Sequence, residues 1–240
     1  MSPTWRCMVR VCAVAISLGF SHSVLAQVQH FRLDSVDGLR LQNVVAQPVT
    51  HQGRKGIRIT ATSSAASDAF APGQLGPELL ASIRGLEVSN GIIEVEVAGA
   101  PAPGADTAAR GFVGIAFRVQ PDQKTYDAFY LRPTNGRAEN QERRNHSAQY
   151  ISHPDWPWFR LRRETPSRYE SYVDLVPDAW TKIRIEVRGA RARLYVNDQP
   201  QPTLIVNDLK SGASGKGGVA LWIGPGTIGH FRDLTVAPAN

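Results

Sequence analysis

The chain is 240 residues long, 42% hydrophobic and 20% charged, with a net charge of +6 at pH 7. This length is ample for one domain with a full hydrophobic core. Two cysteines alone, Cys7 and Cys12, exclude a disulfide-rich scaffold, and the sequence contains neither a glycine-rich phosphate loop nor a serine nucleophile elbow.

The first 26 residues have the pattern of a secretory signal peptide. Arg6 and Arg10 supply positive charge, residues 11–20 are apolar, and a short run of small or aliphatic residues ends at Ala26, where we expect cleavage. The apolar run is about ten residues, half of the roughly 20 that a membrane-spanning helix needs. The sequence therefore predicts a periplasmic or secreted protein with no membrane span.

Residues 27–240 are the predicted mature chain, and we expect them to form a single domain. Both cysteines lie in the signal, so the mature chain has neither a disulfide nor a thiolate nucleophile. Loss of the two arginines of the signal lowers the net charge from +6 to +4. Because an exported protein seldom meets nucleic acid, we do not expect nucleic acid as a partner. No pattern in the sequence indicates an oligomeric state.

Short strands dominate the patterned part of the mature sequence. The clearest hairpin spans residues 181–196, where Ile183, Ile185 and Val187 share one face of the first strand and charged residues the other. Many short strands separated by turn residues, without alternating helices, favour an all-β antiparallel sandwich or barrel. The predicted strands are residues 57–62, 92–97, 111–119, 126–132, 181–188, 191–196, 203–206, 218–223 and 231–236.

Three segments between these strands have other patterns. Residues 77–84 are the one stretch that we expect to be helical, and residues 98–110 are expected to form a long loop. Residues 133–177 lack strand alternation but hold aromatic residues and seven arginines, from Arg137 to Arg168. Because aromatic residues argue against disorder, we interpret this segment as the lid or rim of a binding site.

The order of several motifs resembles a known superfamily. Residues 90–97 are similar to a strand that opens many concanavalin A-like lectin and glucanase domains. Residues 114–118 followed by 126–130 resemble the paired central strands of the 3-keto-disaccharide hydrolase domain, and residues 180–187, 193–197, 218–222 and 231–234 resemble its usual ending. The resemblance implies a concanavalin A-like jelly roll of two antiparallel sheets, with glycans bound on the concave face or at its edge.

Carboxylates are the candidate catalytic residues. Asp127 occupies the place where the resembling family carries a Glu after an aromatic residue, although Asp127 shares its strand face with core residues. Glu164 and Glu170 are the other candidates. A retaining glycosidase needs two carboxylates about 5–5.5 Å apart. The third acid of the endoglucanase signature does not follow Glu94 and Glu96, so the sequence leaves catalysis open.

Arginines and aromatic rings are the candidate ligand-binding groups. Tyr130 and Arg132 share one strand face with Tyr126, and we place Arg118 of the neighbouring strand on the same face. Arginine offers a planar fork of donors for carboxylates, which favours an acidic glycan. The predicted binding residues are Arg118, Tyr130, Arg132, Arg143, Tyr150, Trp156 and Trp158. Packing of the two tryptophans onto the sheet is an equally good explanation of them.

Metal and cofactor binding are not predicted. His146, His153 and Asp155 lack a third well-placed partner for zinc, and no dense Asp and Asn cluster indicates calcium. Three functions remain open. The first is an exported carbohydrate-binding domain, the second is a hydrolase that cleaves the glycosidic bond of a disaccharide or keto-sugar, and the third is a structural or interaction domain of the cell envelope.

Overall fold

The computed structural model describes residues 27–67 and 73–238, so the predicted signal peptide lies outside the described residues. The strands are β1 (Gln29–Phe31), β2 (Leu39–Gln42), β3 (Val44–His51), β4 (Arg54–Ala61), β5 (Leu80–Ile83), β6 (Gly91–Pro101), β7 (Val113–Val119), β8 (Tyr126–Leu131), β9 (Ala148–His153), β10 (Glu170–Ser171), β11 (Thr181–Arg188), β12 (Arg191–Val196), β13 (Leu204–Val206), β14 (Gly218–Ile223) and β15 (Thr227–Ala237). The helices are short: α1 (Ser63–Ser67), the 3-10 turn η1 (Pro133–Asn135), α2 (Gln141–Asn145) and α3 (Trp158–Glu164).

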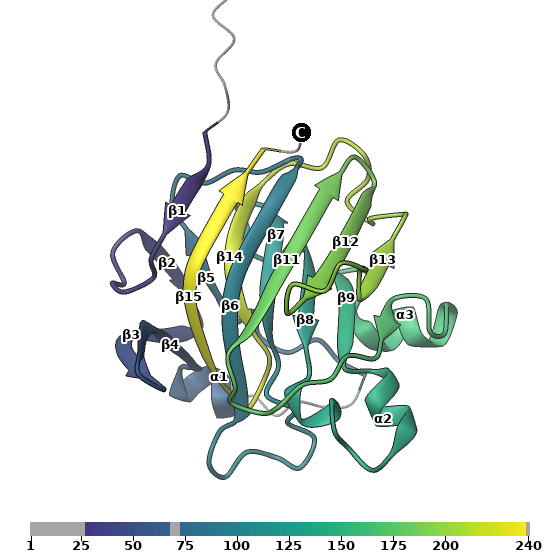
Figure 1. Ribbon diagram of the computed structural model, residues 1–240, viewed down its shortest axis with the longest axis horizontal. Helices are drawn as coiled ribbons and strands as arrows, with labels where there is room; N and C mark the ends of the chain where they lie inside the picture. The colour runs from purple at the N-terminus through teal and green to yellow at the C-terminus, as the bar shows by residue number, and fades with distance from the viewer. Residues whose placement is uncertain (1–26, 68–72, 239–240) are drawn as a thin grey trace, which may run out of the picture.

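Within the described residues these strands form two antiparallel sheets packed as a sandwich (Figure 1). An eight-stranded sheet has the order β13-β12-β11-β6-β15-β4-β3, with β1 also paired to β15. A seven-stranded sheet has the order β10-β9-β8-β7-β14-β5-β2. Consecutive strands pair in hairpins such as β3–β4 and β11–β12, and strands far apart in sequence also pair, as in β6 between β11 and β15.

The core lies between the inner faces of the two sheets. Every second residue of β6 points inward, so Ile93, Val95 and Val97 are buried while Glu94 and Glu96 face outward. On that outward face the acids meet basic residues of neighbouring strands, with Glu96 2.6 Å from the guanidinium of Arg54. The outer face of the eight-stranded sheet is therefore polar and solvated, as the alternation in the sequence predicts.

The outer face of the seven-stranded sheet is different because the chain covers it. All residues of β7 and β8 are buried, on both faces. Gly114 lies opposite Tyr130 on this outer face, and Ala116 lies opposite Ala128. These small side chains leave room for the aromatic rings and covering segments that lie over the sheet.

All nine predicted strands are present, with ends that differ by a few residues. The helix predicted over residues 77–84 is wrong, because that segment contains β5, whose four residues are all buried between β14 and β2. A short apolar run of this kind has no period that separates helix from strand. Residues 133–177 are more structured than predicted, since β9 pairs with β8 along its whole length.

Candidate functional site

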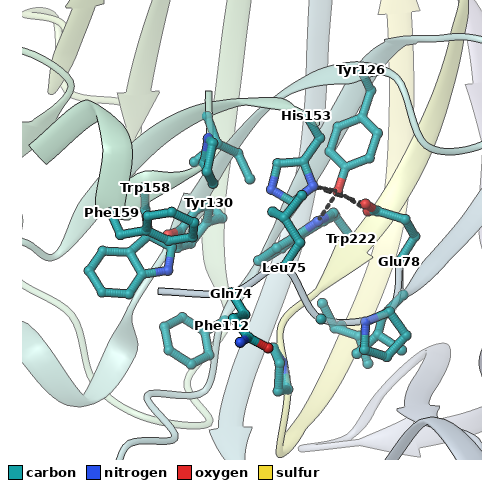
Figure 2. A pocket seen from close by; sticks show the side chains of 17 residues that line it. Gln74, Leu75, Glu78, Phe112, Tyr126, Tyr130, His153, Trp158, Phe159 and Trp222 are labelled. Atoms are coloured by element: carbon teal, nitrogen blue, oxygen red, sulfur yellow. Dashed lines mark hydrogen bonds and ion pairs between the residues drawn. The ribbon is translucent and has the colours of Figure 1, made fainter. Parts of the chain in front are cut away.

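A pocket opens on the outer face of the seven-stranded sheet (Figure 2). Side chains of β8, β9 and β14 form its floor. Residues 74–79 and the beginning of α3 form its walls. Apolar and aromatic side chains make up most of its lining, among them Leu75, Phe112, Tyr130, Ile151, Trp158, Phe159 and Trp222.

Four polar groups meet at one end of the pocket (Figure 2). The hydroxyl of Tyr126 donates to the carboxylate of Glu78 and accepts from Nε1 of Trp222 at 3.1 Å. Nδ1 of His153 lies 3.0 Å from Glu78 Oε1 and 3.1 Å from the Tyr126 hydroxyl. Tyr126 and His153 are direct neighbours across β8 and β9, so the sheet register itself brings them together.

The electrostatics of this group keep the tyrosine protonated. Burial, reinforced by the negative charge of Glu78, raises the pKa of Tyr126 well above its ordinary value. Glu78 is the one carboxylate among the described residues that line the pocket. Its contact with Nδ1 orients the imidazole of His153, whose Nε2 makes no hydrogen bond within the described residues. A His held in this way can bind a hydroxyl or exchange a proton with it.

Aromatic rings form the remainder of the binding surface. Tyr130 stacks on Trp222 with ring centroids 4.6 Å apart, and Phe112 meets Tyr130 edge-on at 6.1 Å. Trp158 and Phe159, from the first turn of α3, meet at 5.8 Å with their planes nearly perpendicular. The pocket thus presents apolar ring faces beside one cluster of polar groups, the usual composition of a small-molecule site.

The buried side chain of Arg132 holds the hydroxyl of Tyr130 in place. Arg132 donates from Nη2 to the Tyr130 hydroxyl at 2.9 Å and to Gln149 Oε1 at 3.0 Å, and from Nη1 to Glu170 at 3.2 Å. Its guanidinium carbon lies 5.9 Å from the ring centroid of Trp158. Burial is the main reason that the pKa of Tyr130 is raised to about 12.

Glu170 is the shared partner of several basic side chains behind the pocket. Arg162 donates to both of its carboxylate oxygens, Arg132 to one, and Nδ1 of His146 lies 3.0 Å from it. Burial by itself raises the pKa of Glu170, but the hydrogen bonds from Arg162 and the charge of Arg132 outweigh it and hold the pKa below its usual range. The carboxylate is therefore a structural counter-ion, 3% exposed, with its oxygens occupied.

The structure brings part of the predicted site together. Tyr130 and Trp158 line the pocket, and Arg132 lies directly behind them. Trp156 lies outside the lining, and its ring centroid is 3.9 Å from the guanidinium carbon of Arg160 and 4.7 Å from the ammonium of Lys210.

Arg143 and Glu164 also lie away from the pocket. Arg143 is in α2, where its guanidinium is 3.4 Å from the side-chain oxygen of Asn135. Glu164 is the exposed last residue of α3 and accepts a hydrogen bond from Arg160 at 3.0 Å.

Three predicted residues lie on the inner side of the sheet instead. Asp127 accepts hydrogen bonds from Tyr150 at 2.6 Å and from Ser211, and both Asp127 and Tyr150 are fully buried. Arg118 donates to Ser211 and to backbone carbonyls including that of Gly212, both at 2.8 Å.

The position of Arg118 on the outer face, beside Tyr126, is a wrong prediction with a local cause. Its φ is +55°, and the register of β7 against β14 shifts at this point, so a β-bulge breaks the alternation.

Sequence reasoning missed Glu78 and His153. Glu78 falls in the segment predicted to be helical, and the sequence around His153 indicates only a candidate metal ligand. The signal that could have found His153 is the register of β9, which the sequence pattern of residues 148–153 does not reveal because that strand is buried on both faces. Trp222, which alternates away from Val219 and Leu221 in the sequence, does line the pocket.

Comparison with solved structures identifies the architecture. The chain is similar to the carbohydrate-binding module CBM66 from Bacillus subtilis, with 12% identity over 82% of this chain and 97% of that one, and a TM-score of 0.51. The chain has the concanavalin A-like jelly-roll fold. At this identity the likeness concerns the fold alone.

Two further solved structures are more distant. A putative glycosyl hydrolase from Parabacteroides distasonis has 11% identity over 88% of this chain and 94% of that one, with a TM-score of 0.49. A protein with a galectin-like fold from Bacillus subtilis has 11% identity over 87% and 94%, with a TM-score of 0.48. No protein family and no curated protein sequence matches the chain. Among the described residues, none of the helices has the length and apolar character to cross a membrane.

Proposed function

We propose that this jelly-roll protein binds a carbohydrate in the pocket of the seven-stranded sheet. The observation that carries the proposal is the pairing of aromatic rings with a polar cluster in one pocket, Tyr130, Trp158 and Trp222 beside Glu78 and His153. A pyranose has an apolar face of C–H groups and a rim of hydroxyls. The aromatic rings can pack against the apolar face, and the carboxylate and imidazole can form hydrogen bonds with the hydroxyls. A carbohydrate-binding module with the same fold is consistent with this occupant.

The charge of the pocket favours a neutral sugar. Glu78 is its one charged side chain among the described lining residues, and an anion beside it would be repelled. The arginines that favour an acidic glycan in the sequence have partners within the protein: Arg132 and Arg162 with Glu170, and Arg137 with Asp174 at 2.8 Å. We propose a neutral mono- or oligosaccharide end as the occupant, and an acidic glycan remains the competing prediction.

We further propose that the protein works after export, in the periplasm or outside the cell. Support comes from the arginines and the apolar run of residues 1–26. Mass spectrometry of protein from the periplasmic or culture fraction should find a chain that begins at Gln27. Recovery of the uncleaved chain from the cytoplasm would contradict this proposal.

A titration with matched tryptophan variants tests the proposed binding. Calorimetry with neutral and uronate-containing oligosaccharides should give saturable binding for the neutral set. Trp158→Ala, which removes a pocket wall, should weaken binding tenfold or more, whereas Trp156→Ala, which changes a tryptophan of the same segment outside the pocket, should not. Equal affinity of both variants and the unchanged protein, or no binding of any glycan, would refute the pocket as the site.

A second candidate function is hydrolysis, favoured by the contact of Glu78 with Nδ1 of His153. A glycosidase of the usual kind needs two carboxylates across the scissile bond, and the described lining residues include one. Turnover of a disaccharide and keto-sugar panel that disappears in Glu78→Gln but survives in Glu164→Gln would establish this alternative. A structural or interaction domain, the third hypothesis, would instead show no glycan binding and no turnover.

A further inference from the structure

The outer face of the eight-stranded sheet holds a second cluster, which lies on the opposite side of the sandwich from the pocket. His51 ends β3, His230 lies in β15, and Asp178 is in the turn before β11. Nε2 of His51 is 3.4 Å from Asp178 Oδ1, and Nδ1 of His230 is 4.0 Å from the same oxygen. We propose that His51, Asp178 and His230 bind a divalent transition-metal ion of the zinc type.

The two imidazoles lie against each other beside Asp178, whose backbone oxygen is 3.1 Å from Nε2 of His51. Their rings stack in parallel with centroids 3.8 Å apart. Nδ1 of His230 is buried and has no hydrogen-bond partner among the described residues.

The three ligand atoms must move slightly closer together to bind one metal ion. The three ligand atoms lie within 4.8 Å of one another. Tetrahedral zinc with bonds of about 2.0–2.2 Å places its ligand atoms roughly 3.4 Å apart. His51 is the last residue of an edge strand, before the turn at Gln52 and Gly53, and Asp178 lies in a loop, so these two ligands can move toward His230 and the stacked rings can tilt apart.

The donor set selects the kind of ion. Two imidazole nitrogens and one carboxylate suit zinc, copper or nickel, whereas calcium and magnesium require mainly oxygen. Asp178 is half exposed, which leaves a side of the cluster open to water as a further ligand.

An ion here would join segments that are distant in sequence. His51 belongs to the β3–β4 hairpin, Asp178 to the turn before β11, and His230 to β15, which pairs with β4 on one side and with β6 on the other. The sequence could not predict the cluster, because its members are separated by more than a hundred and by about fifty residues. Such spacing has no local motif.

Calorimetry with tag-free, metal-stripped protein tests the site. Zinc should bind with one equivalent. His51→Gln and Asp178→Asn should each weaken binding roughly tenfold or more, and magnesium and calcium should not bind. His30→Gln is the matched control, since His30 lies on the same sheet 3.6 Å from Asp233 with no second histidine beside it. The His30 variant should bind zinc like the unchanged protein.

Trp180 provides an independent optical measurement. Its ring centroid is 5.4 Å from that of His51. One equivalent of Cu²⁺ should therefore quench tryptophan fluorescence, and Trp180→Phe should remove most of that quenching. Circular dichroism checks that each variant is folded. If His51→Gln does not fold, the zinc affinity of Asp178→Asn tests the proposal. Absence of zinc binding, or one equivalent bound with unchanged affinity in Asp178→Asn, would overturn the proposal.

Discussion

Replacement of Glu170 by Gln tests whether the ion cluster behind the pocket is structural. The substitution keeps the shape of the side chain but removes the negative charge that Arg132 and Arg162 share. The side chains of Arg132 and Glu170 are 7% and 3% exposed, so the charge of Arg132 would remain buried without a counter-ion. We expect the folded state to lose stability and the hydroxyl of Tyr130 to lose its fixed position.

The size of the stability loss depends on the hydrogen bonds that Arg132 retains in the variant. Removal of one partner from a buried ion pair typically costs about 3–5 kcal/mol. Arg132 retains hydrogen bonds to the carbonyl of His146, to Tyr130 and to Gln149, and the amide oxygen of the introduced glutamine could still accept one bond. These contacts place the expected loss at the lower end, about 3 kcal/mol. For a urea slope of roughly 2–3 kcal/mol/M, the unfolding midpoint falls by about 1 M.

Urea unfolding followed by circular dichroism measures this loss. Glu164→Gln is the matched control, since Glu164 is also paired with an arginine but is exposed at the end of α3. Its unfolding midpoint should stay within experimental error of the unchanged protein, because exposed ion pairs contribute little. If the two variants unfold at the same urea concentration, the assignment of Glu170 as a structural counter-ion is refuted, and a catalytic role for it regains support.

Three further changes have defined outcomes. Gly114→Ala would place a Cβ 2.2 Å from the carbonyl oxygen of Phe129, so we expect a loss of about 1–3 kcal/mol in urea unfolding; an unchanged midpoint would refute the crowding. Tyr126→Phe removes the donor to Glu78 and should cost about 1–2 kcal/mol and weaken glycan binding in calorimetry, unlike a mutation outside the pocket. The pKa of His230 is about 4 in the folded protein and 6.5 in the reference state, so its neutral form contributes stability above pH 6.5 that is lost as the pH falls toward 4. Metal-free protein should therefore become less stable over this range, and a flat profile of unfolding free energy would contradict it.

The two strands that the sequence predicts most clearly share a physical property. In β6 and β11 one face is in the core and the other in water, so apolar and charged residues alternate and each strand can be recognised by itself. β5 and β9 are buried on both faces and carry no such alternation. The sequence pattern therefore predicts a helix for β5 and part of a lid for β9, although it does predict strands for β7 and β8, which are also buried on both faces.

The candidate site was predicted only in part because it depends on register. Trp158 is predicted from residue type, since aromatic rings in a loop-rich segment favour binding, and Tyr130 from the strand face that it shares with Tyr126 and Arg132. Glu78 and His153 meet Tyr126 through the pairing of β8 with β9 and through the path of residues 74–79 over the sheet, and neither is a local property of the sequence. Arg118 was misplaced because one bulged residue reverses the alternation that follows it.

The contrast between the two sheets contains a signal that sequence analysis can use. A sandwich with both outer faces in water should have alternating strands throughout. Here β7 and β8 are nearly continuous in apolar residues, whereas β6 and β11 alternate. Apolar residues on the outer face of one sheet would be unfavourable unless another part of the chain, or a ligand, covered them. The non-alternating strands therefore identify the covered sheet, and the pocket that the covering segments leave open over Tyr126 and Tyr130 is where we expect a ligand to bind.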